Sequence, residues 1–102
     1  MNEKTLKNTL NSIGRGVFVE CFSIFESYAN SQISRDDCIE KLTQKYPNKE
    51  ESGCKICCNK AKSIFEENMQ CKAIGIICDN WGQTKLSDET IEKTMLLLQD
   101  CS

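Results

Sequence analysis

The fold of this chain is decided by the stretch from Ser52 to Trp81, which reads SGCKICCNKAKSIFEENMQCKAIGIICDNW. The stretch holds five of the eight cysteines and the only tryptophan. Residues spaced by three and four share one face of a helix, and here that face carries Cys54, Cys57, Ala61, Ile64, Phe65 and Asn68. Another face is polar and carries Lys55, Asn59, Lys62 and Glu66. The pattern predicts an amphipathic helix with Ser52 as its N-cap and a left-handed turn at Asn68.

A second helix is predicted from Met69 to Asp79, and Gly82 follows as a C-terminal stop signal. It is apolar on nearly all sides, which is typical of a buried helix. One face carries Cys71, Ile74 and Cys78, with Ala73, Ile76 and Ile77 beside it. Trp81 is either a core anchor or a contact for a partner, and we favour the anchor.

The N-terminal part carries a long apolar stripe at helical spacing, formed by Leu6, Leu10, Ile13, Val17, Cys21, Ile24 and Tyr28. Gly14-Arg15-Gly16 interrupts the stripe, and each glycine costs about 1 kcal/mol relative to alanine in a helix. Either the helix breaks at these glycines or a neighbouring helix packs closely against them. Because the stripe keeps its phase, we expect one long helix with a close contact.

Two more helices carry clear start signals. Ser34 caps a predicted helix that ends at Tyr46, before Pro47, and a polar loop follows. Ser87 caps the last helix after a loop at 82–86, and its expected core face is Ile91, Met95 and Leu98, with Leu97 next to it. The chain shows no strand-like alternation of useful length. We therefore predict an all-α fold: one domain, residues 1–102, with about five helices in orthogonal or bundle-like packing.

The composition argues against catalysis. The chain has no histidine, so the usual general base and the Ser-His and Cys-His nucleophile pairs are missing. Its acidic pairs are neighbours in sequence, and neighbours point apart on a helix. No phosphate-binding loop or nucleophile motif occurs. We predict a protein that is not an enzyme, with no catalytic residues, no cofactor and no small-molecule substrate.

The cysteines are predicted to be reduced. The start of the chain lacks the apolar core of a signal peptide, and no apolar run reaches the ~18 residues of a membrane span. We expect a cytoplasmic protein whose buried cysteines act as small apolar residues. A less favoured alternative is a zinc site made by Cys54, Cys57, Cys58 and Cys71. Cys78 cannot join Cys71 on one ion, because seven helical residues span about 10 Å and zinc-bound sulfurs lie within about 4.6 Å.

The second alternative to a purely structural domain is nucleic-acid binding. The predicted helices 36–46 and 53–67 resemble a helix-turn-helix pair in their order. The second of them offers phosphate- and base-binding side chains on its polar face, namely Lys55, Asn59, Lys60 and Lys62. Against this, the loop is long, the helix has no arginine, and the net charge is -2.

Recognition of another protein is the function that we expect. The lack of catalytic groups, the slightly acidic balance and the aromatic-rich first segment favour a small non-catalytic binding protein. Inhibitors, immunity-type proteins and regulators are all of this kind, and the partner is either another protein or a second copy of the chain. Nucleic-acid binding through the lysine face is the alternative, and a zinc or redox role for the cysteines is the third hypothesis.

Overall fold

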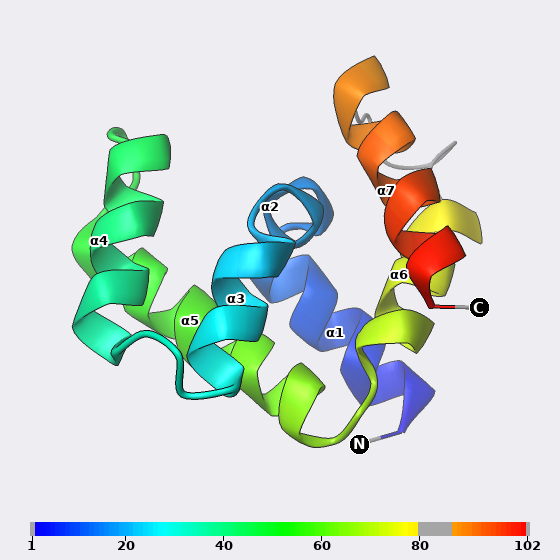
Figure 1. Ribbon diagram of the computed structural model, residues 1–102, viewed down its shortest axis with the longest axis horizontal. Coiled ribbons are helices and arrows are strands. Elements are labelled where there is room, and N and C mark those ends of the chain that lie inside the picture. Colours follow the sequence, from blue (N-terminus) through cyan, green and yellow to red (C-terminus); the bar gives the residue numbers. More distant parts are fainter. Residues whose placement is uncertain (1, 80–86, 102) are drawn as a thin grey trace.

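Seven helices make up the part of the chain that the computed structural model describes, residues 2–79 and 87–101 (Figure 1). In chain order they are α1 (Glu3–Ile13), α2 (Arg15–Glu20), α3 (Phe22–Ala29), α4 (Arg35–Lys45), α5 (Glu51–Glu66), α6 (Gln70–Asp79) and α7 (Asp88–Asp100). No strand occurs within these residues. The predicted all-α class is confirmed, but the helices outnumber the five that were expected.

The extra helices come from two breaks in the N-terminal stripe. α1 ends at Ile13, and Gly14 adopts a φ of 97°, a left-handed conformation that a residue with a Cβ rarely takes. A second break lies at Cys21, between α2 and α3. In Figure 1, α2 is seen nearly end-on while α1 runs across the view. The prediction of one unbroken helix is therefore wrong. Each short helix still turns an apolar face inward, but the buried face shifts by one residue after the break. Phe18 and Phe25 are fully buried, whereas Val17 and Ile24 of the stripe are half-buried.

The helix ends agree with most of the sequence signals. The hydroxyl of Ser34 accepts a hydrogen bond from the Asp37 amide at 3.1 Å, and Ser87 caps α7 in the same way. Asn68 has a φ of 56°, which confirms the predicted left-handed turn. Ser52 is not the cap of α5, because that helix begins at Glu51 and its N-cap is Glu50, two residues before Ser52. Glu50 caps it without a side-chain hydrogen bond.

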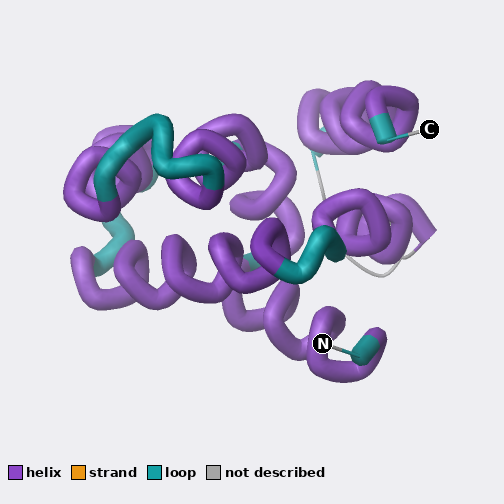
Figure 2. Tube along the Cα trace, turned by 60° about the horizontal axis from the view of Figure 1, so that its bottom comes forward, coloured by secondary structure: helices purple, strands orange, loops and turns teal. Residues whose placement is uncertain are grey.

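The core is built around α5, which packs against α1, α3 and α4 (Figure 2). Its predicted inner positions are buried: Cys54, Cys57, Ala61, Ile64 and Phe65. The ring of Phe65 contacts Phe22 and Phe18, with centroid distances of 5.1 and 6.1 Å. These contacts join α5 to α2 and α3 through one aromatic cluster, since aromatic rings at such distances attract each other.

The helices α6 and α7 pack together on the other side of the molecule, and α7 also contacts α2. α6 buries Ala73, Ile74, Ile76 and Ile77. Trp81 and the predicted loop at 82–86 lie outside the described residues, so their expected roles stay predictions. The radius of gyration is 12.7 Å, the value expected of a compact chain of this length. None of the helices in the described ranges has the length and apolar character that crossing a bilayer requires.

Candidate interaction surface

The last helix turns a polar face inward and an apolar face outward. The residues of α7 that are buried are Thr90 and Thr94, while Leu97 is half-buried. Met95, Leu96 and Leu98 are 48%, 55% and 36% exposed. The predicted core face of this helix is therefore wrong. Met95 and Leu98 of its apolar stripe face solvent, and Ile91 is half-buried.

Hydrogen bonds to α2 and within α7 explain why the threonines lie inside. The Thr90 hydroxyl donates to the carboxylate of Glu20 at 2.8 Å, and Lys93 donates to the backbone carbonyl of Glu20 at 3.0 Å. The Thr94 hydroxyl is satisfied by the Thr90 carbonyl at 2.7 Å. Because buried hydroxyls with partners cost little, α7 can dock through polar side chains. The partner of Thr90 lies 70 residues away, so no local pattern reveals it.

Glu20 joins three helices at one point. Its carboxylate also lies 3.5 Å from Lys45 of α4, which donates to the Glu20 carbonyl at 3.2 Å. The hydrogen bond from Thr90 is the main cause that lowers the pKa of Glu20, and the nearby Lys93 and Lys45 lower it further. The charged form of Glu20 therefore holds α7 and α4 against the C-terminal end of α2. The helix dipole also favours the positive charges of the lysines at this end.

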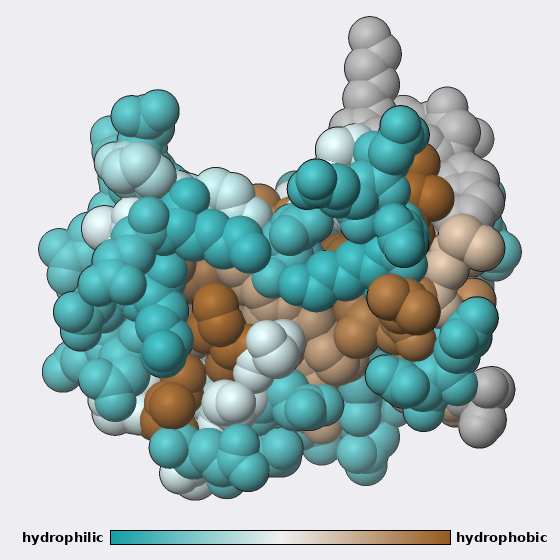
Figure 3. Space-filling model, turned by 45° about the horizontal axis from the view of Figure 1, so that its top comes forward, coloured by the Kyte–Doolittle hydropathy of each residue, from teal (hydrophilic) through white to brown (hydrophobic). Residues whose placement is uncertain are grey.

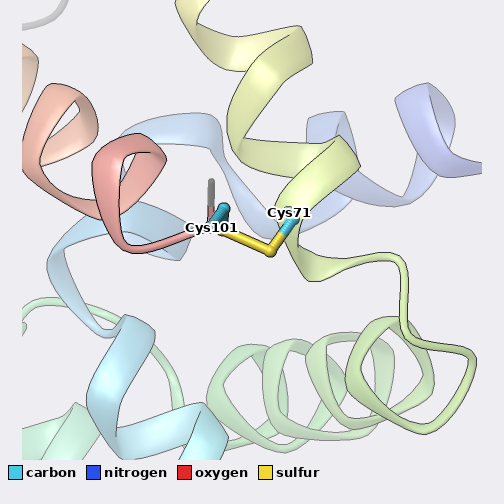
Figure 4. Close-up of a disulfide and its surroundings, with 2 residues drawn as sticks. All are labelled: Cys71 and Cys101. Carbon is cyan, nitrogen blue, oxygen red and sulfur yellow. A yellow bond between two sulfur atoms is a disulfide. The ribbon is translucent and has the colours of Figure 1, made fainter.

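A disulfide fixes the far end of α7. Cys71, at the start of α6, is bonded to Cys101, directly after α7, and their Cα atoms are 5.6 Å apart (Figure 4). The prediction that all cysteines are reduced is wrong for this pair, whereas the other six are free thiols. Cys71 is exposed rather than on the buried face of α6. The cytoplasmic location that was inferred together with reduced thiols stays a prediction.

The exposed stripe borders a shallow groove. We call Ile91, Met95 and Leu98 of α7, together with Cys78 of α6, the α7 apolar face. A groove of about 320 Å³ is lined by Cys78, Met95, Leu98 and Gln99. Figure 3 shows hydrophobic atoms among hydrophilic ones on the side of the molecule where Figure 1 places α7.

The border of this face is acidic. Glu92 is three residues before Met95, and Asp88 is three before Ile91, so both acidic side chains flank the stripe. Both are exposed. Lys93 is the only basic residue of α7, and its amine is engaged by the Glu20 carbonyl. The α7 apolar face is thus an apolar strip with a negative rim.

The cysteines proposed for zinc are not brought together. Cys54, Cys57 and Cys58 are buried on α5, and Cys71 is bonded to Cys101 in the α6–α7 pair. Within the described part of the chain, no three or more cysteine, aspartate or glutamate side chains are placed to hold a metal ion. All eight cysteines belong to that part.

The lysine face of α5 is largely offset by acidic neighbours. Lys55 lies 3.8 Å from Glu51, and Lys62 lies 4.0 Å from Glu66 and 4.9 Å above the ring centre of Tyr28. The remaining two residues of the proposed nucleic-acid face are Asn59, which is exposed, and Lys60, which is half-buried. This face therefore carries less positive charge toward solvent than its lysines alone suggest.

The described helices and this surface define an all-α protein with an acid-rimmed apolar strip on its last helix. No protein-family model matches the chain, and neither a curated protein nor a solved structure shows significant similarity to it. Its function has to be argued from its own residues.

Proposed function

We propose that this chain acts by binding another protein through the α7 apolar face. The observation that carries the proposal is the exposure of Met95 and Leu98, 48% and 36%, on a helix whose buried residues are threonines. Apolar side chains gathered on one exposed face are typical of interaction sites. Burying the exposed part of each of them in a contact contributes about 1 kcal/mol, because roughly half of each side chain is still accessible. Inhibitor, immunity-type and regulatory proteins all work through such a contact.

The partner is expected to offer an apolar ridge with basic side chains beside it. Asp88 and Glu92 would face those basic groups, and opposite charges across an interface favour the correct partner. A second copy of the chain fits less well. A two-fold dimer puts the same patch on both sides, so the acidic rims would meet each other. We therefore favour a different protein, one that inserts an amphipathic helix.

A pair of synthetic helical peptides tests this proposal. Both carry the same leucine ridge, but one has lysines and the other glutamates along its rim. We expect the lysine-rimmed peptide to bind, as measured by isothermal titration calorimetry, and its binding to shift the amide resonances of α7. The double variant Met95→Ser/Leu98→Ser should weaken binding at least about tenfold, because it removes two apolar contacts.

A matched control is available on α5. Ile56 is 51% exposed and lies on another helix, so Ile56→Ser removes a comparable apolar group without touching α7. This variant should bind the lysine-rimmed peptide as the unmodified chain does. Equal loss in Ile56→Ser, or no binding of either peptide, would contradict the proposal. A dimer in sedimentation that Met95→Ser/Leu98→Ser dissolves would instead make a second copy the occupant.

A further inference from the structure

Two buried cysteines face each other between α4 and α5. The sulfurs of Cys38 and Cys58 are 3.0 Å apart, and both side chains are 0% exposed. A disulfide bond measures about 2.05 Å, so the two sulfurs need to approach by only about 1 Å. Both residues lie within regular helices, and α4 packs directly against α5.

The neighbouring thiols of α5 are directed elsewhere. The Cys57 thiol donates to the backbone carbonyl of Ile13 at 3.7 Å, and Cys54 accepts from the Thr43 hydroxyl at 3.9 Å. Both contacts are longer than the one between Cys38 and Cys58. The arrangement therefore selects one pair among the buried cysteines.

We propose that Cys38 and Cys58 form a redox-active dithiol that oxidises to a second disulfide. The oxidant is an external disulfide such as oxidised glutathione. The Cys38 thiolate attacks one of its sulfurs and releases one thiolate, and the Cys58 thiolate then attacks the mixed disulfide and releases the other. Two protein thiols lose two protons and two electrons, and the external disulfide becomes two thiols.

The environment determines when oxidation takes place. In the closed structure a hydrogen bond from Cys58 lowers the pKa of the Cys38 thiol. Because neither sulfur is exposed, the external disulfide reaches Cys38 only while α4 is open or before the chain has folded. Oxidation is thus expected to be slow in the native protein and fast during refolding.

The two bridges would hold opposite parts of the molecule. The Cys71–Cys101 bond ties α7 to α6, and a Cys38–Cys58 bond would tie α4 to α5. Figure 1 shows α4 and α7 on opposite sides of the central helices. Each peripheral helix would then be joined covalently to the helix against which it packs.

Counting alkylated cysteines tests the proposal on the full chain. The protein is refolded in a mixture of reduced and oxidised glutathione, acid-quenched, unfolded, alkylated and weighed. With Cys71–Cys101 as the one bridge, six of the eight cysteines are alkylated, and a second bridge leaves four. We expect four, and trypsin should yield peptide 36–41 linked to peptide 56–60. Six alkylated cysteines, or Cys38 linked to another peptide, would overturn the proposal.

A matched pair of variants identifies the partner, because peptide 56–60 contains both Cys57 and Cys58. Cys57→Ala and Cys58→Ala each remove one buried thiol from α5. Cys57→Ala should keep the linked peptide and Cys58→Ala should lose it. Both variants keep the Cys71–Cys101 bond, but only Cys57→Ala can also form the Cys38–Cys58 bond. Oxidation should therefore raise the melting temperature of Cys57→Ala by about 10 °C more than that of Cys58→Ala. The reverse pattern would contradict the assignment. If Cys58→Ala does not fold, Cys57→Ala alone decides, because Cys58 is then the only cysteine of peptide 56–60: loss of the linked peptide in that variant would overturn the proposal.

Discussion

The helices α4 and α7 both lie at the edge of the molecule, yet they are held in different ways. α4 buries Cys38, Ile39 and Leu42 against its neighbours. α7 fully buries no large apolar side chain and is held by hydrogen bonds to Glu20 and by a disulfide. The first attachment buries the apolar side chains of the helix, whereas the second leaves Met95, Leu96 and Leu98 exposed and buries Leu97 only in part.

This difference shows that the same apolar residues cannot serve the core and a partner at once. A helix that buries its stripe gains stability from it. A helix that keeps its stripe outside needs another attachment, and in α7 polar side chains and one covalent bond supply it. The cysteines divide in the same way, since those of α4 and α5 are buried and free whereas Cys71 and Cys101 are bonded.

The largest effect on stability is expected when a buried leucine of α4 is replaced, and an exposed leucine of α7 provides the comparison. Leu42 is 1% exposed, and Leu42→Ala should lower the free energy of unfolding by about 3–5 kcal/mol through lost burial and a cavity. Leu98→Ala should lower it by less than about 1 kcal/mol, because Leu98 is 36% exposed. Urea unfolding of both variants measures the contrast. Similar losses in the two would mean that α7 is held by its apolar residues after all.

The second prediction concerns the bridge. Cys71→Ser/Cys101→Ser should lower the free energy of unfolding by about 2–4 kcal/mol, because the unfolded chain regains the freedom that a cross-link over 30 residues removes. Hydrogen exchange of α7 amides should become faster while that of α4 amides changes little. Cys78→Ser is the control, a half-buried cysteine of α6 without a bond. If Cys78→Ser lowers stability equally, the bridge is not what holds α7.

A smaller effect is expected from the charge at Glu20. Glu20→Gln should lower the free energy of unfolding by about 1 kcal/mol near neutral pH, because it weakens charge-assisted bonds to Thr90, Lys93 and Lys45. The pKa of Glu20 is lowered from 4.5 in the folded protein. Its contribution is therefore complete above pH 4.5 and is lost as the pH falls through the folded pKa.

Urea unfolding across acidic pH measures this dependence. The difference in stability between the unmodified chain and Glu20→Gln should shrink as the pH falls below 4.5. Glu26→Gln, at an exposed position of α3, should show little difference at any pH. A difference that persists unchanged in acid would show that the charge of Glu20 does not hold α7.

The smallest effect is expected on the lysine face of α5. Replacing Lys55, Lys60 and Lys62 with glutamine should change stability by no more than about 0.5 kcal/mol each, because such surface pairs contribute little. Random duplex DNA should bind the unmodified chain no tighter than about 10⁻⁴ M at about 150 mM salt. Micromolar binding with a steep salt dependence that the triple variant abolishes would favour nucleic-acid recognition over protein recognition.

Local patterns in the sequence predict much of this fold. The all-α class, the caps at Ser34 and Ser87, the turn at Asn68 and the inner face of α5 all follow from spacing and from residues near in sequence. Each depends on contacts within a few turns of one helix. The surface proposed for binding includes Ile91, Met95 and Leu98. The sequence pattern also selected these residues, but it predicted that they belong to the core.

The features that the spacing of apolar residues does not predict depend on residues far apart in the sequence. The apolar stripe continues at helical spacing through both breaks in the sequence, so its spacing cannot distinguish one helix from α1, α2 and α3. α7 has apolar residues on several sides, and its orientation is set by Glu20 far along the chain. The disulfide requires Cys71 of α6 to meet Cys101 at the end of α7. The residues next to either cysteine in the sequence give no sign of this pairing.

The bond between Cys71 and Cys101 closes residues 71–101 into a covalent ring. A protease that cuts the backbone once inside this ring therefore produces two fragments that stay attached to each other. On a denaturing gel the nicked protein would run as one species without reductant and as two with it. A single cut anywhere between Cys71 and Cys101 therefore releases neither half of this ring.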